Sequence, residues 1–169
     1  PYSHLSIDTT TGSRPIRWTV PSVRWYANDR TVLGLSASQF QSVIAQAFST
    51  WEGVPTASIA FQFAGFTSAV PFDDDGLSVF GFDSQPDMDR VLGATSFIVD
   101  VVTGAIVESD VFFNAIFAWS VTPSGDASRF DLRSVATHEI GHFIGLGHSA
   151  IGETEPRPDG GRRVLGSGA

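Results

Sequence analysis

Apolar residues recur along the chain with two different periods, and each period predicts a different kind of element. Alternation of apolar and polar positions, typical of a strand with one buried face, marks most of the region before residue 113. The strands predicted in this way are IRWTV (16–20), VRWYAN (23–28), SIAFQFAG (58–65), LSVFGF (77–82), GATSFIVD (93–100) and AIVESDVFF (105–113). The last two are separated by VVTG, a short glycine-containing segment that favours an antiparallel turn.

Two segments show the 3.6-residue period of an amphipathic helix. In the first, Ser36 and Gln39 have the form of a capping box, and Gly53 marks the end. Its apolar stripe consists of Phe40, Val43, Ile44, Ala47, Phe48 and Trp51. The second helix is predicted to begin after Asp131 as N-cap. Its stripe consists of Leu132, Val135, Ala136, Ile140, Phe143 and Ile144.

The order of these elements is strand, helix, a run of strands and a helix, which predicts an α+β fold with helices packed on a mixed sheet. We expect a polar, loosely held amino-terminal arm over residues 1–15 and one main unit over 16–149. Residues 150–169 contain Pro156, Pro158 and several glycines, so we expect an irregular loop there.

The composition of the chain limits the partners and metal ligands that can be expected. The net charge of −8 disfavours a nucleic-acid partner, because phosphates would be repelled. The chain has no cysteine, so a metal must be held by His, Asp or Glu. The most apolar stretch, VFFNAIFAWSV at 111–121, is far shorter than the ~20 residues of a membrane span, so no span is expected.

Three of the four histidines lie in HEIGHFIGLGHS at 138–149, on the second helix. His138 and His142 are four residues apart and therefore lie within ~40° of each other, one helical turn apart. A helix continued to His148 would carry that residue ~9 Å further along the axis and ~240° around it, out of reach of a shared ion. Gly145, which can take a positive φ at little cost, is placed to end the helix, and Gly147 adds freedom.

Three neutral histidines would leave one position of a tetrahedral zinc ion open for water, as in catalytic rather than structural zinc sites. The ion lowers the pKa of that water toward ~7. Glu139, next to the first histidine, can accept the proton of the water and pass it to a leaving amine. The alternative is a set of helix-surface histidines without a metal. The capped amphipathic helix and the glycine at the required position favour zinc.

The pattern HExxHxxGxxH, formed by His138, Glu139, His142, Gly145 and His148, resembles the zinc signature of the metzincin metalloendopeptidases. Ser149 makes the motif most similar to the matrixin branch, and the form of the motif resembles its bacterial members. The resemblance implies a zincin-like fold with a twisted five-stranded mixed sheet, a backing helix and an active-site helix. It also implies that GATSFIVD is the antiparallel edge strand with which an extended peptide substrate pairs.

Three features depart from the family pattern. The only methionine, Met88, precedes the motif, so the methionine-containing turn that follows the third histidine in metzincins is missing. Only 21 residues follow His148, so we expect a short or missing C-terminal subdomain. Either a longer parent polypeptide supplies the rest or the protein is atypical, and we favour the longer polypeptide. No histidine lies between Phe66 and Asp100, where animal matrixins hold a structural zinc, so we expect a single zinc. A pro-segment cysteine cannot be sought in this chain.

Asp73, Asp74 and Asp75 supply hard oxygen ligands, and matrixins bind calcium in the corresponding region. Their spacing lacks the alternation of an EF-hand loop, so a solvated acidic turn is the competing interpretation. For Asp110 we expect a structural role, as a cap or bridge.

We therefore expect a secreted, extracellular zinc endopeptidase of matrixin type, with His138, His142 and His148 as ligands and Glu139 as general base. Two alternatives stay open. One is a fragment that binds zinc but has lost turnover together with its lower cleft. The other is a non-enzymatic, calcium-dependent binding module. Stoichiometric zinc would exclude the second alternative, and cleavage of an unfolded protein would exclude the first.

Overall fold

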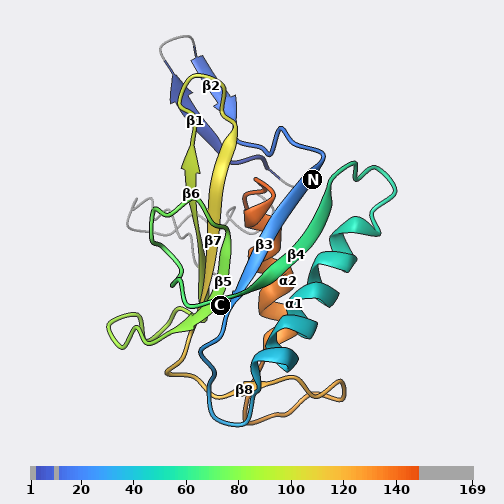
Figure 1. The fold of residues 1–169 in the computed structure, drawn as a ribbon, viewed down its shortest axis with the longest axis vertical. Coiled ribbons are helices and arrows are strands. Elements are labelled where there is room, and N and C mark those ends of the chain that lie inside the picture. Colours follow the sequence, from blue (N-terminus) through green and yellow to red (C-terminus); the bar gives the residue numbers. More distant parts are fainter. Residues whose placement is uncertain (1–2, 10–11, 149–169) are drawn as a thin grey trace, which may run out of the picture.

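The computed structural model describes residues 3–9 and 12–148. Its main sheet has five strands in the order β4-β3-β5-β7-β6. Their bounds are β3 Ser22–Asn28, β4 Ala60–Thr67, β5 Val79–Asp83, β6 Gly93–Val99 and β7 Ile106–Asn114. The first four strands of this order run parallel, and β6 alone is antiparallel, paired with β7 at one edge of the sheet. The predicted mixed sheet with an antiparallel edge strand is thus confirmed (Figure 1).

Two helices, α1 (Ala37–Glu52) and α2 (Leu132–Phe143), pack against each other and against the sheet. The predicted capping box is present, because the Ser36 hydroxyl accepts from the Gln39 N–H and the Gln39 side chain accepts from the Ser36 N–H. Asp131 caps α2 as predicted, accepting from the N–H groups of Arg133 and Ser134. Both helices therefore begin where their side chains can satisfy the first free backbone donors.

The hydrophobic core lies between the helices and one face of the sheet. Trp25 of β3 contacts Phe48 of α1, and Phe48 in turn contacts Phe143 of α2. Phe143 also contacts Phe80 of β5, so the end of α2 is packed into the aromatic core. All four rings are at most 2% exposed. This packing fixes α2, which carries two of the motif histidines, relative to the sheet.

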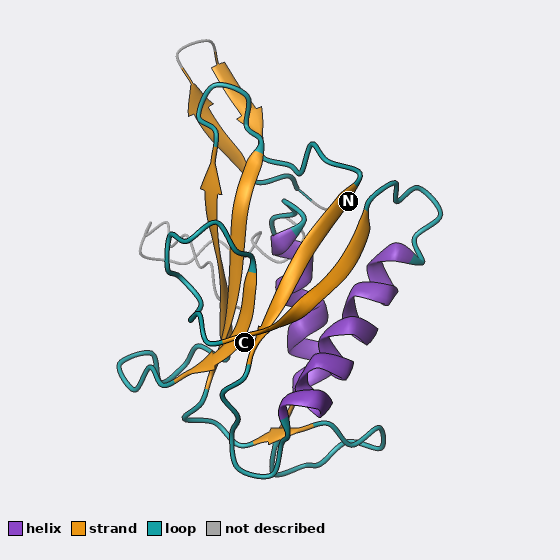
Figure 2. Ribbon diagram, in the orientation of Figure 1, coloured by secondary structure: helices purple, strands orange, loops and turns teal. Residues whose placement is uncertain are grey.

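The prediction of a loosely held arm over residues 1–15 is wrong for residues 3–9 and 12–15, which the structure describes. β1 (Ser6–Thr9) and β2 (Gly12–Pro15) form a two-stranded antiparallel sheet that projects at one end of the molecule (Figure 2). The arm also bonds to the main unit, since the Leu5 N–H donates to the Gly145 carbonyl. Composition alone could not show this, because the partners of the arm are ~140 residues away in the chain.

The predicted strand at 16–20 is also wrong. Only Arg17 forms a bridge, to Ala105, and the segment otherwise lacks strand structure. Proline at 15 and 21 limits strand pairing at both ends. The Trp18 indole instead donates to the carbonyl of Phe143, 2.8 Å away, and so caps the end of α2.

Two short strands complete the described part, β8 (Trp119–Ser120) and β9 (Phe130–Asp131), which pair in parallel just before α2. No helix in the described ranges is long and apolar enough to cross a membrane. The loop expected at 150–169 lies outside the described residues.

Candidate metal centre

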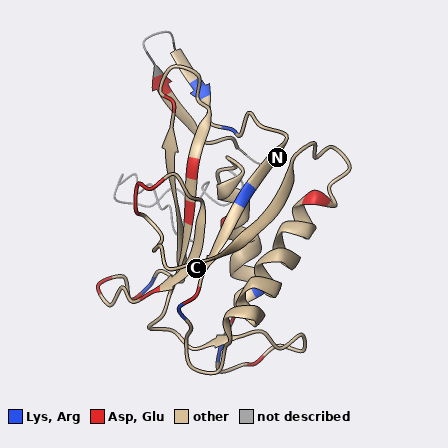
Figure 3. Ribbon diagram, viewed as in Figure 1, with Lys and Arg blue, Asp and Glu red and all other residues tan. Residues whose placement is uncertain are grey.

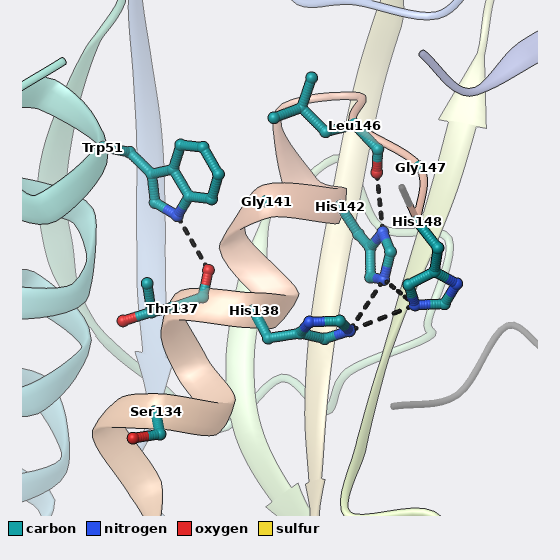
Figure 4. A pocket seen from close by; sticks show the side chains of 9 residues that line it. All are labelled: Trp51, Ser134, Thr137, His138, Gly141, His142, Leu146, Gly147 and His148. Carbon is teal, nitrogen blue, oxygen red and sulfur yellow. Dashed lines mark hydrogen bonds between the residues drawn. The ribbon is translucent and has the colours of Figure 1, made fainter. Parts of the chain in front are cut away.

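The three motif histidines meet at one point beside α2. The Nε2 atom of His142 lies 3.2 Å from that of His138 and 3.1 Å from that of His148, and the latter two are 3.3 Å apart (Figure 4). Ligands 2.0–2.1 Å from a tetrahedral zinc ion are themselves separated by about 3.3–3.4 Å. The three nitrogen atoms thus already have close to the spacing that zinc requires.

The hydrogen bond of His142 indicates which of its ring nitrogen atoms faces the other two histidines, and this favours a cation between them. Its Nδ1 lies 2.7 Å from the Leu146 carbonyl, which can only accept, so in the neutral ring Nδ1 carries the proton and Nε2 has a free lone pair. At most two of the three N···N contacts can then be hydrogen bonds. A shared metal ion would satisfy all three lone pairs at once.

Local structure explains how a residue six positions after His142 reaches the same point. Gly145 has φ +93°, and its N–H donates to the His142 carbonyl, so the chain leaves the helix there. A side chain at this glycine would also require the backbone to shift, because its Cβ would clash with the Ile16 carbonyl oxygen. The predicted sharp turn at Gly145 is confirmed.

Gly147 was expected to add conformational freedom to the turn, but the structure uses this glycine in a different way. It is not among the glycines with positive φ in the described chain, so its conformational freedom is not used. A Cβ at this position would instead lie 2.8 Å from the hydroxyl oxygen of Ser3. The glycine therefore allows the close approach of the amino-terminal arm.

Glu139 lies against the edge strand rather than in open solvent. It is 3% exposed, and the Thr95 hydroxyl of β6 donates to its Oε2 atom at 2.7 Å. Burial raises the pKa of this carboxyl, while the Thr95 hydrogen bond and the nearby His148 act in the opposite direction. A buried carboxylate with a raised pKa is better suited to accept a proton than an exposed one.

The pKa of His138 is lowered, chiefly by desolvation of the ring and further by the adjacent His142 and His148. A lowered pKa keeps this imidazole neutral and leaves its lone pair available to a metal.

A hollow lies in front of α2 and leads to the histidines (Figure 4). Its lining includes Trp51 of α1, whose indole N–H donates to the Thr137 carbonyl at 2.8 Å. The indole approaches Gly141 so closely that a Cβ there would lie 2.9 Å from the ring. The glycine within HEIGH thus lets α1 and α2 come together beside the site.

Sequence reasoning missed three contributors to this site, namely Thr95, Trp51 and Ser3. Thr95 lies on the predicted edge strand, and the alternation of that strand could have placed it on the helix-facing side. Trp51 was assigned only to the core. No local signal marks Ser3, because its partners His148 and Gly147 are about 145 residues away.

A separate group of acidic residues lies on β7 and in the loop before β5 (Figure 3). Asp73, Asp74 and Asp75 are exposed, and no cluster of three metal-ligating side chains includes them among the described residues. Asp110 accepts from the N–H groups of Phe72 and Val79, at 2.6 and 2.8 Å, which matches the expected bridging role. Glu108 accepts from the Gly76 N–H. The two buried carboxylates hold the Asp-rich loop on the sheet.

In a comparison with known families, residues 17–154 match the family described as Matrixin. The matched segment includes the whole sheet, both helices and all three motif histidines.

Among individual proteins, the chain is similar to metalloendoproteinase 1 of Glycine max, with 34% identity over 125 residues, covering 66% of this chain and 35% of that protein. It is also similar to metalloendoproteinase 2-MMP of Arabidopsis thaliana, with 33% identity, covering 69% and 30%. The chain thus spans about a third of the length of these relatives. Both are plant proteins, so they do not support the expected bacterial type.

Proposed function

Since the chain belongs to the matrixin family, we propose that it is a zinc-dependent endopeptidase that hydrolyses internal peptide bonds of extended polypeptides. The observation that carries the proposal is the convergence of the Nε2 atoms of His138, His142 and His148 beside the buried carboxylate of Glu139. The plant relatives are named metalloendoproteinases, which supports the same class of reaction.

In this proposal His138, His142 and His148 hold one zinc ion. Bound zinc supplies a Lewis acid that lowers the pKa of a coordinated water and polarises a carbonyl. Glu139 accepts the proton of the attacking water and delivers it to the leaving amine. Thr95 holds the Glu139 carboxylate at the edge of the sheet, where the proton is to be transferred.

The edge strand β6 is the proposed binding site for the substrate. It pairs with β7 on one side only, at the end of the sheet order, and α2 lies alongside it. An extended peptide added to its free edge would form main-chain hydrogen bonds and run past Glu139. Because such bonds do not depend on side chains, we expect tolerance of sequence along the substrate. We propose that the lower wall of the cleft is supplied by a further portion of the same polypeptide.

The proposal is tested by metal analysis combined with proteolysis. We expect one zinc per chain, cleavage of unfolded casein or gelatin, and loss of cleavage with a zinc chelator. Glu139→Ala should lower kcat by about 10²–10⁴-fold while one zinc stays bound, because a general base contributes on that order. Glu52→Ala, an exposed glutamate outside the site, is the matched control and should keep its activity.

Two results would contradict the proposal. A pure protein that binds one zinc but cleaves nothing would indicate the zinc-binding fragment without turnover. A protein without stoichiometric zinc would indicate the non-enzymatic binding module instead.

Calcium and secretion are secondary parts of the proposal. Calcium at Asp73, Asp74 and Asp75 would use their exposed carboxylates, and it predicts a higher unfolding temperature with millimolar calcium than with a calcium chelator. An unchanged unfolding temperature would instead support the interpretation of these residues as a solvated acidic turn that binds no calcium. Secretion predicts that the protein is recovered from the medium rather than from the cells.

A further inference from the structure

Residues 3–5 lie antiparallel to residues 145–147, the segment that leads to the third histidine. The Leu5 N–H donates to the Gly145 carbonyl at 2.9 Å, and the Gly147 N–H donates to the Ser3 carbonyl at 2.7 Å. Between these bonds His4 forms an antiparallel bridge with Leu146. The Ser3 hydroxyl also donates to the carbonyl of His148 at 2.6 Å. We call residues 3–5 the clamp segment.

Residues 145–148, which the clamp segment holds, position two of the three histidines. They include His148 itself, and the carbonyl of Leu146 accepts from Nδ1 of His142 and so sets the orientation of that ring. A displacement of residues 145–148 would therefore move one nitrogen of the site and release another. His138, which lies on α2 four residues before His142, is positioned by the helix.

The helix alone does not hold the end of this segment. Its last backbone bonds run from the Gly145 N–H to the His142 carbonyl and from the Leu146 N–H to the Gly141 carbonyl, and the His142 side chain reaches no further than the Leu146 carbonyl. Beyond these bonds, the Gly147 N–H and the His148 carbonyl are both bonded to Ser3. From residue 147 onward, the position of the chain in the described structure thus depends on the clamp.

Packing agrees with the hydrogen bonds. The space for a Cβ is filled at Gly145 by the Ile16 carbonyl and at Gly147 by the Ser3 hydroxyl. Ile16 is tied to the clamp in turn, because its N–H donates to the Leu5 carbonyl at 2.9 Å. The turn is therefore enclosed between the two ends of the amino-terminal arm, and both glycines are needed for that fit.

We propose that the clamp segment is a positioning element for the metal centre, which places His148 and the His142 ring for zinc. The proposal rests on zinc binding as proposed above. It assigns to Ser3 a positioning role without metal ligation or proton transfer, since its hydroxyl and carbonyl bond to the backbone of His148 and Gly147. An intact arm then sets the zinc affinity and the geometry of the site.

The test compares zinc affinity in the full chain and in point variants, by competition with a chromophoric chelator. Ser3→Ala should weaken zinc binding about tenfold, at the lower end of the effect of residues that orient metal ligands. The d–d absorption band of the cobalt-substituted protein should shift in position or intensity. Ser3→Thr keeps the hydroxyl and should restore both. Ser13→Ala, an exposed serine on β2 of the same arm, is the matched control.

A double-variant cycle separates the clamp from a general effect on folding. Gly147→Ala places a methyl group against the Ser3 hydroxyl and should weaken zinc binding on its own. In the Ser3→Ala background that hydroxyl is absent, so the added loss should be smaller than in the wild type. Circular dichroism of the metal-free proteins should be the same for all variants, since Ser3 is exposed.

Equal zinc affinities and equal cobalt spectra in the wild type, Ser3→Ala and Gly147→Ala would overturn the clamp while leaving the proposed function intact. Additive losses in the double variant would also overturn it, because they would show that the two positions act independently. Absence of zinc from the wild type would instead overturn the proposed function.

Discussion

Thr95 determines where the carboxylate of Glu139 points. Its hydroxyl is 2.7 Å from Oε2 and 3.2 Å from the Glu139 main-chain carbonyl, so one edge-strand residue contacts both ends of the glutamate. Because a buried carboxylate of this kind has few polar partners, each hydrogen bond strongly influences the direction in which the carboxylate points.

Thr95→Val should therefore lower kcat/KM for peptide cleavage by about tenfold, the size expected for a hydrogen bond to a charged group. Valine keeps the shape and the strand propensity, so the zinc content should stay at one per chain. Ser96→Ala, the next residue on the same strand, faces the other side and is the control. Equal kcat/KM in wild type and Thr95→Val would show that Glu139 is oriented without this bond.

The geometry of the site depends on the backbone conformation of Gly145, where the chain leaves α2. Gly145→Ala combines a φ of +93° with a Cβ that clashes with the Ile16 carbonyl oxygen. We expect a loss of about 2 kcal/mol or more in the free energy of unfolding, together with weaker zinc binding. Urea unfolding and the chelator competition measure the two effects. A variant as stable as the wild type would show that the turn can relax.

At the scale of elements, the loop at residues 72–79 is held on β7 by buried carboxylates. Burial raises the pKa of Asp110 to about 6, and Glu108 and Asp75 add to the shift, while hydrogen bonds from Val79 and Phe72 oppose it. The ordinary pKa of an aspartate is near 3.9. The native protein therefore binds more protons than the unfolded chain between these two values.

Stability should consequently fall as the pH rises from about 4 to about 6, by an amount on the order of 2 kcal/mol from this group. Asp110→Asn cannot ionise and should remove that part of the slope. The measurement is urea unfolding at several pH values in this range, with exposed Asp87→Asn as the control that keeps the slope. A slope unchanged in Asp110→Asn would contradict the assignment to Asp110.

At the scale of the whole molecule, the metal site joins parts of the chain that are distant in sequence. The His148 segment contacts the amino-terminal arm, and α2 is anchored in the aromatic core through Phe143. A ligand that binds only the folded state stabilises the entire cooperative unit.

Zinc at 100 times its Kd should raise the free energy of unfolding by about 2.7 kcal/mol, and a chelator should remove this increment. His148→Ala should lose most of it, because a zinc ion held by two histidines binds more weakly. Thermal unfolding followed by circular dichroism, with and without zinc, is the measurement. Equal midpoints under both conditions would show that zinc binding is not linked to folding.

The sequence by itself determined the features that depend on neighbours within a few residues. The capping box at Ser36 and Gln39, the N-cap at Asp131 and the sharp turn at Gly145 are local interactions, and all three were predicted. The spacing of His138, Glu139 and His142 follows from the helical repeat and was therefore also predictable.

Only the tertiary structure decided which distant segments meet. Alternation along a strand shows which side chains are buried, but it does not name the adjacent strand, so the order β4-β3-β5-β7-β6 could not be derived from it. The bond from Thr95 to Glu139 and the pairing of Ser3 with Gly147 are contacts of this kind. They leave no local pattern, because their energy depends on a fold that brings together residues 44 and 144 positions apart.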